Sequence, residues 1–118
     1  MTNLSIMSQL LVLNRTDLTA LSLLFKALAN EYRVSILNLL RTGPKNVSQI
    51  AKELRLEQTV VSHSLKCLYF CGLVTSERLG KTRIYSLNLE TVEPILRIGD
   101  KHISKYAANL KTCNTLQR

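Results

Sequence analysis

Apolar residues recur at helical spacing in the first forty positions of the chain. Over residues 18–29 they are three or four positions apart, which predicts a core helix with one apolar stripe, made of Leu18, Leu21, Leu24, Phe25 and Leu28. Asn30 is predicted to cap a second helix, because an Asn side chain accepts hydrogen bonds from the free amides of a first turn. We expect the cluster Thr42-Gly43-Pro44 to end it.

Two further short helices are predicted, with a tight turn between them. The first covers residues 46–54, the second runs from about Gln58 to Phe70, and Arg55 and Leu56 form the turn. Each places apolar residues on one face, namely Val47, Ile50, Ala51 and Leu54 in the first and Val61, Leu65 and Leu68 in the second. Because the second helix is polar along its other face, the pair has the pattern of a helix-turn-helix.

A β-hairpin and a long helix are predicted to complete the chain. Gly72 stops the preceding helix, and two alternating runs, residues 73–79 and 82–87, flank the turn dipeptide Gly80-Lys81. The long amphipathic helix has Thr91 as its predicted cap and Pro94 in its first turn. Its apolar stripe, which suggests a dimer interface, consists of Val92, Ile95, Leu96, Gly99, Ile103, Tyr106, Ala107 and Leu110.

Length and charge refine this picture. A chain of 118 residues with 46% hydrophobic residues is predicted to form one winged helix-turn-helix domain over residues 1–118, mainly α with a small β-hairpin wing, and with dimerisation helices at both ends. The formal net charge is +8, of which +5 falls on residues 41–83. Because a polyanion attracts basic surface through counterion release, the basic middle third points to nucleic acid.

Several classes of protein do not fit the sequence. The first residues, MTNLSIMSQLLVLNRTD, carry no basic start or cleavage site, and no apolar run is long enough to span a bilayer, so we expect a cytoplasmic protein with no membrane partner. Three cysteines make a disulfide framework improbable in that compartment. An enzyme is not expected, because the chain has no Gly-rich phosphate loop and no nucleophile set beside a base.

Four segments between residues 23 and 89 resemble the ArsR/SmtB family of metal-responsive repressors. They are residues 25–37 (FKALANEYRVSIL), 61–68 (VSHSLKCL), 72–74 (GLV) and 83–87 (RIYSL). The chain departs from the family pattern at Glu57, where a capping Ser is frequent, and at Thr59, where Pro is common. The resemblance implies a homodimeric winged helix-turn-helix repressor that binds double-stranded operator DNA.

The resemblance also implies which residues meet DNA. Those on the helix that enters the major groove are Gln58, Thr59, Ser62, His63 and Lys66, and those of the wing that touch phosphate or the minor groove are Arg78, Lys81 and Arg83. The chemistry agrees, because Gln and Lys read base edges and wing cations add affinity without sequence information. In the alternative interpretation these residues form an ordinary solvated helix face, and His63 is a packed or capping histidine.

Two cysteines form a pair on the predicted reading helix. Cys67 and Cys71 are four positions apart, so their Cβ atoms lie roughly 6 Å apart on one face and two thiolates can hold one metal ion. Cys113, near the end of the long helix, can supply a third sulfur, and three thiolates favour a soft cation over magnesium or calcium. Alternatively, Cys67 and Cys71 are small core residues.

The cysteines resemble those of the cadmium- and lead-sensing type of this family. That resemblance implies Cys67, Cys71 and Cys113 as ligands, with cadmium or lead favoured over zinc as the effector that releases DNA. The family's zinc pattern on the last helix is half present, because Asp100 and His102 match it but Cys113 stands where a later His belongs. We expect Asp100 and His102 to be surface residues.

Two other functions are compatible with the sequence. A thiol redox repressor of the same fold would use a disulfide between Cys67 and Cys71, or between Cys113 and either of them. A winged-helix protein without an effector would bind another protein through its long helix. Thiol reactivity and binding to duplex DNA distinguish these alternatives.

Overall fold

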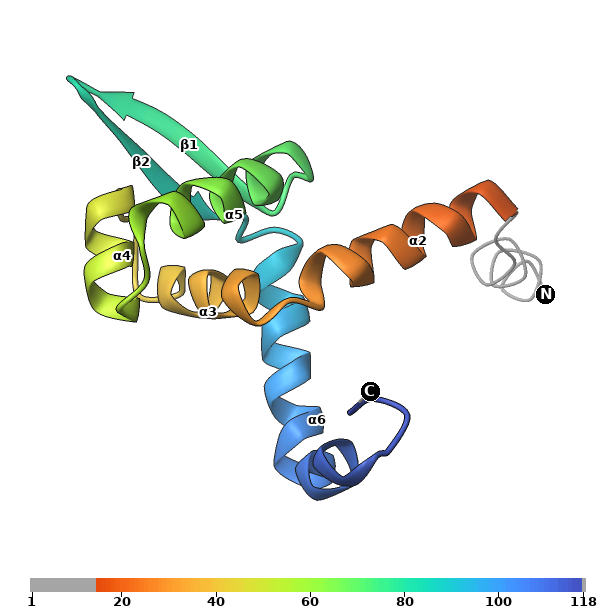
Figure 1. Ribbon diagram of the computed structural model, residues 1–118. Helices are drawn as coiled ribbons and strands as arrows, with labels where there is room; N and C mark the ends of the chain where they lie inside the picture. Colours follow the sequence, from red (N-terminus) through yellow and green to blue (C-terminus); the bar gives the residue numbers. More distant parts are fainter. Residues whose placement is uncertain (1–14, 118) are drawn as a thin grey trace.

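The computed structural model describes residues 15–117. It confirms a mainly helical fold with one two-stranded antiparallel hairpin (Figure 1). The elements follow in the order α2 (Arg15–Leu28), α3 (Glu31–Leu40), α4 (Val47–Leu54), α5 (Gln58–Phe70), β1 (Val74–Leu79), β2 (Thr82–Leu87) and α6 (Val92–Thr112). Among these residues, no helix has the length and apolar character that a membrane span needs.

One hydrophobic core lies between α3, α4, α5 and the base of the hairpin. Its largest fully buried side chains are Ile36, Leu37, Ile50, Val61, Leu65, Leu68, Val74 and Val92. Because α4 and α5 are short and each buries only one face, the pair forms the predicted helix-turn-helix and leaves the outer face of α5 in solvent. The core thereby positions the polar side of α5.

Side-chain caps define where the helices begin. Asn30 caps α3, because its Oδ1 accepts a hydrogen bond from the Arg33 amide at 3.1 Å, as predicted. Asn46 and Gln49 form a reciprocal capping box at the start of α4, with both hydrogen bonds at 2.8 Å. At the start of α5, Glu57 occupies the N-cap position and its side chain makes no capping hydrogen bond.

The hairpin is joined directly to α5. Gly72, at φ +79°, ends the helix, and the Leu73 amide donates to the Leu68 carbonyl at 2.9 Å, which closes the last turn. The register pairs Leu79 with Thr82, so Gly80 and Lys81 form the predicted two-residue turn. An isolated bridge between Lys45 and Tyr85 ties the hairpin to the segment before α4, with hydrogen bonds of 2.8 and 3.0 Å.

The predicted core helix at the N-terminal end was only partly correct. Ala27 of α2 is buried, and Leu24 and Leu28 pack against the core, but Leu18 and Phe25 are 53% and 57% exposed. The reason is visible in Figure 1, where α2 extends away from the other helices and only its C-terminal end reaches them. Most of its apolar stripe is therefore uncovered in the single chain.

The long helix α6 also leaves the core after its first turns. Val92 is fully buried and Leu96 packs against the core, whereas Ile103 is 52% exposed. The predicted capping by the Thr91 side chain is wrong: Thr91 stands at the N-cap position without a capping hydrogen bond. The first two amides of the helix are taken by the backbone carbonyl of Asn88, which accepts from Val92 and Glu93 at 3.0 and 3.2 Å.

An ion pair links α6 to the end of α3. Arg41, the C-cap residue of α3, donates to the carboxylate of Asp100 at 2.6 Å. The Arg41 hydrogen bond and charge hold the pKa of Asp100 below its usual range. This contact joins residues 59 positions apart on two elements that otherwise touch sparsely, so it helps to set the direction of α6.

We predict that Asp100→Asn lowers the thermal midpoint slightly at pH 7 and has a smaller effect at pH 3. Because the folded-state pKa is depressed, the stabilisation is present above the unfolded value of about 4 and is lost as the pH falls through the folded value. Thermal melts followed by circular dichroism at both pH values measure this. Glu53→Gln, which changes an exposed carboxylate that makes no ion pair among residues 15–117, is the control. An equal shift in both variants would contradict the assignment.

Candidate nucleic-acid interface and thiol site

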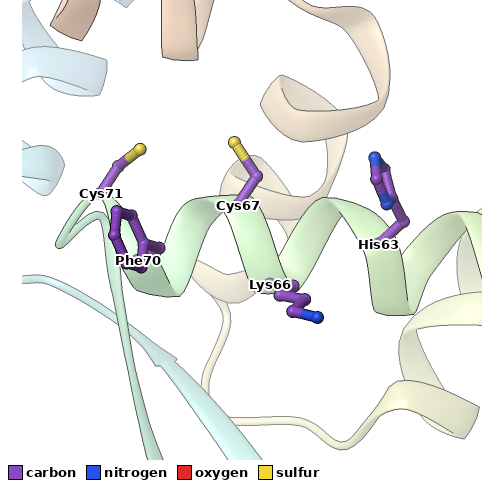
Figure 2. Close-up of a pocket in the computed structure, with 5 residues that line it drawn as sticks. All are labelled: His63, Lys66, Cys67, Phe70 and Cys71. Carbon is purple, nitrogen blue, oxygen red and sulfur yellow. The ribbon is translucent and has the colours of Figure 1, made fainter.

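The residues predicted to read DNA lie along the exposed surface of α5 but not on one side of it: His63 points to the side of Cys67 and Cys71, and Lys66 points away from it (Figure 2). Gln58, Thr59, Ser62, His63 and Lys66 are all exposed, and the buried positions of the same helix point to the core. The Gln58 amide nitrogen lies 3.3 Å from the Ser48 hydroxyl in the first turn of α4, within hydrogen-bond distance. This contact brings the first turns of α4 and α5 to the same surface.

The predicted wing cations are also exposed. Arg78 and Arg83 are direct partners across the hairpin, and Lys81 lies in the turn. Arg83 donates to the Ser76 hydroxyl at 2.9 Å, and the Nε of Arg78 lies 3.3 Å from the Gly80 carbonyl. Like charges directly opposite one another destabilise a strand pair. An anion beside the hairpin would remove that repulsion.

A cleft between α4 and the hairpin turn adds residues that sequence reasoning missed. It has a volume of about 280 Å³ and is lined by Asn46, Val47, Ser48, Lys81, Thr82 and Arg83. Lys45 lies beside it through the bridge to Tyr85. The basic charge of residues 41–83 was the only signal for this cleft, because only the tertiary fold brings residue 48 close to residue 83.

Cys67 lies in α5 and Cys71 is the C-cap residue of that helix, and the two are on one side of it. Figure 2 shows the sulfurs of Cys67 and Cys71 pointing the same way as the ring of His63, while Lys66 points elsewhere. Cys67 is half-buried and Cys71 is exposed. Together with Phe70, which is 91% exposed, these residues line a shallow pocket of about 280 Å³. The structure therefore brings the predicted pair together, as the four-residue spacing requires.

The electrostatic surroundings of Cys71 come from three elements. Desolvation raises the pKa of the Cys71 thiol, and Cys67 raises it further by charge repulsion and by a hydrogen bond between the two thiols. The positive charge of Arg33 lowers it. Arg33 is held in place by α2, because its side chain donates to the carbonyls of Ala27 and Lys26 at 2.6 and 3.1 Å. A guanidinium is thus fixed near the thiols, a role not foreseen from sequence.

The third predicted sulfur is not part of this group within one chain. Cys113 is the C-cap residue of α6, at the far end of that helix from the core (Figure 1). Within residues 15–117 no three His, Cys, Asp or Glu side chains lie close enough to hold a metal ion. Asp100 pairs with Arg41, and the His102 ring lies 4.7 Å from that of Tyr106.

Comparison with known proteins finds a family and several relatives that share this architecture. Residues 30–76 match the family model described as bacterial regulatory protein, arsR family. The chain is 44% identical over 62 residues to the HTH-type transcriptional regulator NmtR of Mycobacterium tuberculosis. That match covers 52% of each chain, so this chain spans about half the length of that curated relative. It is 32% identical over 75 residues to the arsenical resistance operon repressor of Staphylococcus xylosus, covering 64% of this chain and 72% of that repressor.

A solved structure supports the same assignment. The homodimeric winged helix-turn-helix DNA-binding domain of a possible ArsR-family regulator from Mycobacterium bovis aligns with a TM-score of 0.65 and 32% identity, over 75% of this chain and 85% of that one. The fold and the exposed face of α5 therefore define a winged helix-turn-helix DNA-binding protein. More specifically, the chain belongs to the arsR family of bacterial regulatory proteins, whose members are transcriptional regulators rather than enzymes.

Proposed function

We propose that this protein is a homodimeric transcriptional repressor that leaves its operator DNA when a thiophilic metal ion binds Cys67 and Cys71. The main support is that Cys67 lies in α5 and Cys71 is its C-cap residue, because α5 also holds the predicted base-reading residues. The relative from Staphylococcus xylosus, named for arsenical resistance, supports a link to thiophilic elements. Cadmium or lead is the favoured effector, ahead of zinc, because an all-sulfur donor set suits soft cations. Such a repressor works in the cytoplasm, where the DNA is.

The exposed apolar faces of α2 and α6 are proposed to pack against a second copy of the chain. A groove of about 420 Å³ runs between α3 and α6, lined by residues that include Leu28, Val34, Ile95 and Ile103. The exposed stripes of α2 and α6 continue this apolar surface. A small domain gains most by burying such stripes in a symmetric interface. The homodimeric domain from Mycobacterium bovis supports this assembly.

The dimer is proposed to place two α5 helices in successive major grooves. Helix-turn-helix dimers bind inverted repeats with half-sites about one helical turn, roughly 34 Å, or a multiple apart. In this proposal Gln58 and Ser62 read base edges, while Lys81 and Arg83 neutralise phosphates beside the cleft at the start of α4. Affinity then falls steeply as salt rises.

The third sulfur is proposed to come from Cys113 of the partner subunit. One chain leaves its own Cys113 at the far end of α6, away from the pair (Figure 1). Because α6 is the proposed dimer helix, the partner's Cys113 is the remaining source. A metal ion bound by all three thiolates would tie the reading helix to the partner's tail, and a ligand shifts an equilibrium by its differential affinity for the two states.

A thiol redox repressor is the second candidate. It is favoured by the four-residue spacing of the free thiols of Cys67 and Cys71, which puts both sulfurs on one side of the helix (Figure 2). In that case diamide would release operator DNA, dithiothreitol would restore binding, and metal ions would have no effect.

We predict that Ile103→Glu converts a dimer into a monomer at micromolar concentration. The substitution places a charge in the apolar groove that a second copy is proposed to cover. Multi-angle light scattering should give twice the chain mass for the wild-type protein and one chain mass for the variant. Lys101→Glu, on the opposite face of α6, should remain dimeric. A monomeric wild-type protein would refute the assembly.

We predict different effects for wing and reading-helix variants. Arg83→Ala should weaken binding to operator and random DNA alike and reduce the salt slope by about 1 for each lost phosphate contact. Gln58→Ala should cost about 1–3 kcal/mol at the preferred base and relax specificity there. Fluorescence anisotropy across a salt series measures both effects, with Lys101→Ala as the control. Equal losses on both DNAs for all variants would contradict the assigned roles.

We predict that cadmium or lead weakens operator binding roughly 5- to 150-fold, a coupling of about 1–3 kcal/mol. Operator DNA should weaken metal binding by the same factor, because linkage is reciprocal. Cys67→Ser and Cys71→Ser should bind DNA and ignore the metal ion, and Cys113→Ser should do the same if it supplies the third sulfur. Thiolate-to-metal absorbance reports occupancy. Unchanged operator affinity at saturating cadmium, lead and zinc would rule out the sensor.

A further inference from the structure

We propose that Cys67 and Cys71 of one chain form, by themselves, a complete site for Cu(I), held between two thiolates in near-linear geometry. This inference rests on the proposed function, because it names a further ion for the same thiol pair. It differs in needing no sulfur from the partner. The number of donor atoms that one chain offers determines which soft metal ion the thiol site can bind.

One chain offers two donors here and no more. Cys67 and Cys71 extend their sulfurs to the same side of α5 (Figure 2). His63 points the same way, but it lies eight positions before Cys71, which is roughly 12 Å along a helix. Metal–ligand bonds are only about 2.0–2.3 Å long, so one ion cannot bind both His63 and Cys71. The pocket lining contains no carboxylate, and residues 15–117 hold no cluster of three potential ligands.

Few metal ions have a complete coordination shell with two thiolates alone. Structural zinc sites are almost always four-coordinate, so zinc would need two further ligands, and cadmium and lead sites of the proposed type need a third sulfur. Cu(I) is a soft d¹⁰ ion that thiolates select, and two opposed sulfurs are a sufficient coordination shell for it. Residues four positions apart on a helix are neighbours on one face, and Figure 2 shows both sulfurs on the same side of the helix, so the pair can approach one small ion together.

The charge of the site suits a monovalent ion. Binding releases two protons, because two neutral thiols and one Cu(I) become a bis-thiolate complex with a net charge of −1, and no electron is transferred. Arg33 lies near Cys71, fixed by its hydrogen bonds to α2, so one cation is present to balance that single negative charge. The exposed ring of Phe70 adds an apolar wall beside the sulfurs.

The site is tested by titrating reduced protein with Cu(I) buffered by bicinchoninate, without oxygen. Wild-type protein and Cys113→Ser should each bind one Cu(I) per chain with the same affinity. Ellman's reagent should then find one reactive thiol in the wild-type protein and none in Cys113→Ser. X-ray absorption should show two sulfur neighbours. Cys67→Ser and Cys71→Ser, the matched controls, should lose competition with bicinchoninate.

Other outcomes separate this inference from the proposed function. A shell of three sulfurs, weaker Cu(I) binding in Cys113→Ser, or wild-type protein that fails to compete with bicinchoninate would overturn the inference. Operator binding is followed in parallel with cadmium and lead. If either releases the operator while Cu(I) does not bind the pair, the inference fails and the proposed function stands. If Cu(I) binds the pair as described while no ion changes operator affinity, the site stands and the proposed function fails.

Discussion

The burial of one face of α5 is the interaction on which the rest of this structure depends. Val61, Leu65 and Leu68 are fully buried in the core between α3, α4 and the hairpin base. Because a helix has 3.6 residues per turn, placing those three inside determines where every other side chain of α5 points. The polar residues of its first half then face outward, and the cysteines fall on the flank that lies nearest α2. The proposed DNA contacts and the proposed thiol site therefore share one rigid element.

Local patterns were sufficient to predict most of the fold. The cap at Asn30, the helix stop at Gly72 and the turn at Gly80 each depend on residues within a few positions, and the structure has them where expected. The Thr91 side chain makes no capping hydrogen bond because the amide of Glu93 already donates to the Asn88 carbonyl and Pro94, the third residue of the helix, has no amide hydrogen. The Asn88 contact is set by the turn before the helix, which the sequence pattern does not reveal.

The parts that could not be predicted depend on long-range contacts. The apolar stripe of α2 indicated a buried helix, but spacing does not say whether the cover comes from the same chain or from another copy. Arg33 and Ser48 were missed because their importance arises only when α3 packs between α2 and the end of α5 and when α4 meets the hairpin. The cysteine pair was predictable, since two residues four apart on a helix must be neighbours, whereas Cys113 lies on a separate element.

The direct junction between α5 and the hairpin has a consequence for the length of DNA that one subunit covers. Gly72 and the closing hydrogen bond from Leu73 leave no flexible linker between the reading helix and β1. The reading helix and the wing are therefore held at a fixed separation. If both contact DNA as proposed, substitutions in either element change which bases or phosphates are favoured, but the distance between the two contacts stays constant. The protein could then acquire new operators with the same spacing of contacts, and a different spacing would require residues to be inserted at this junction.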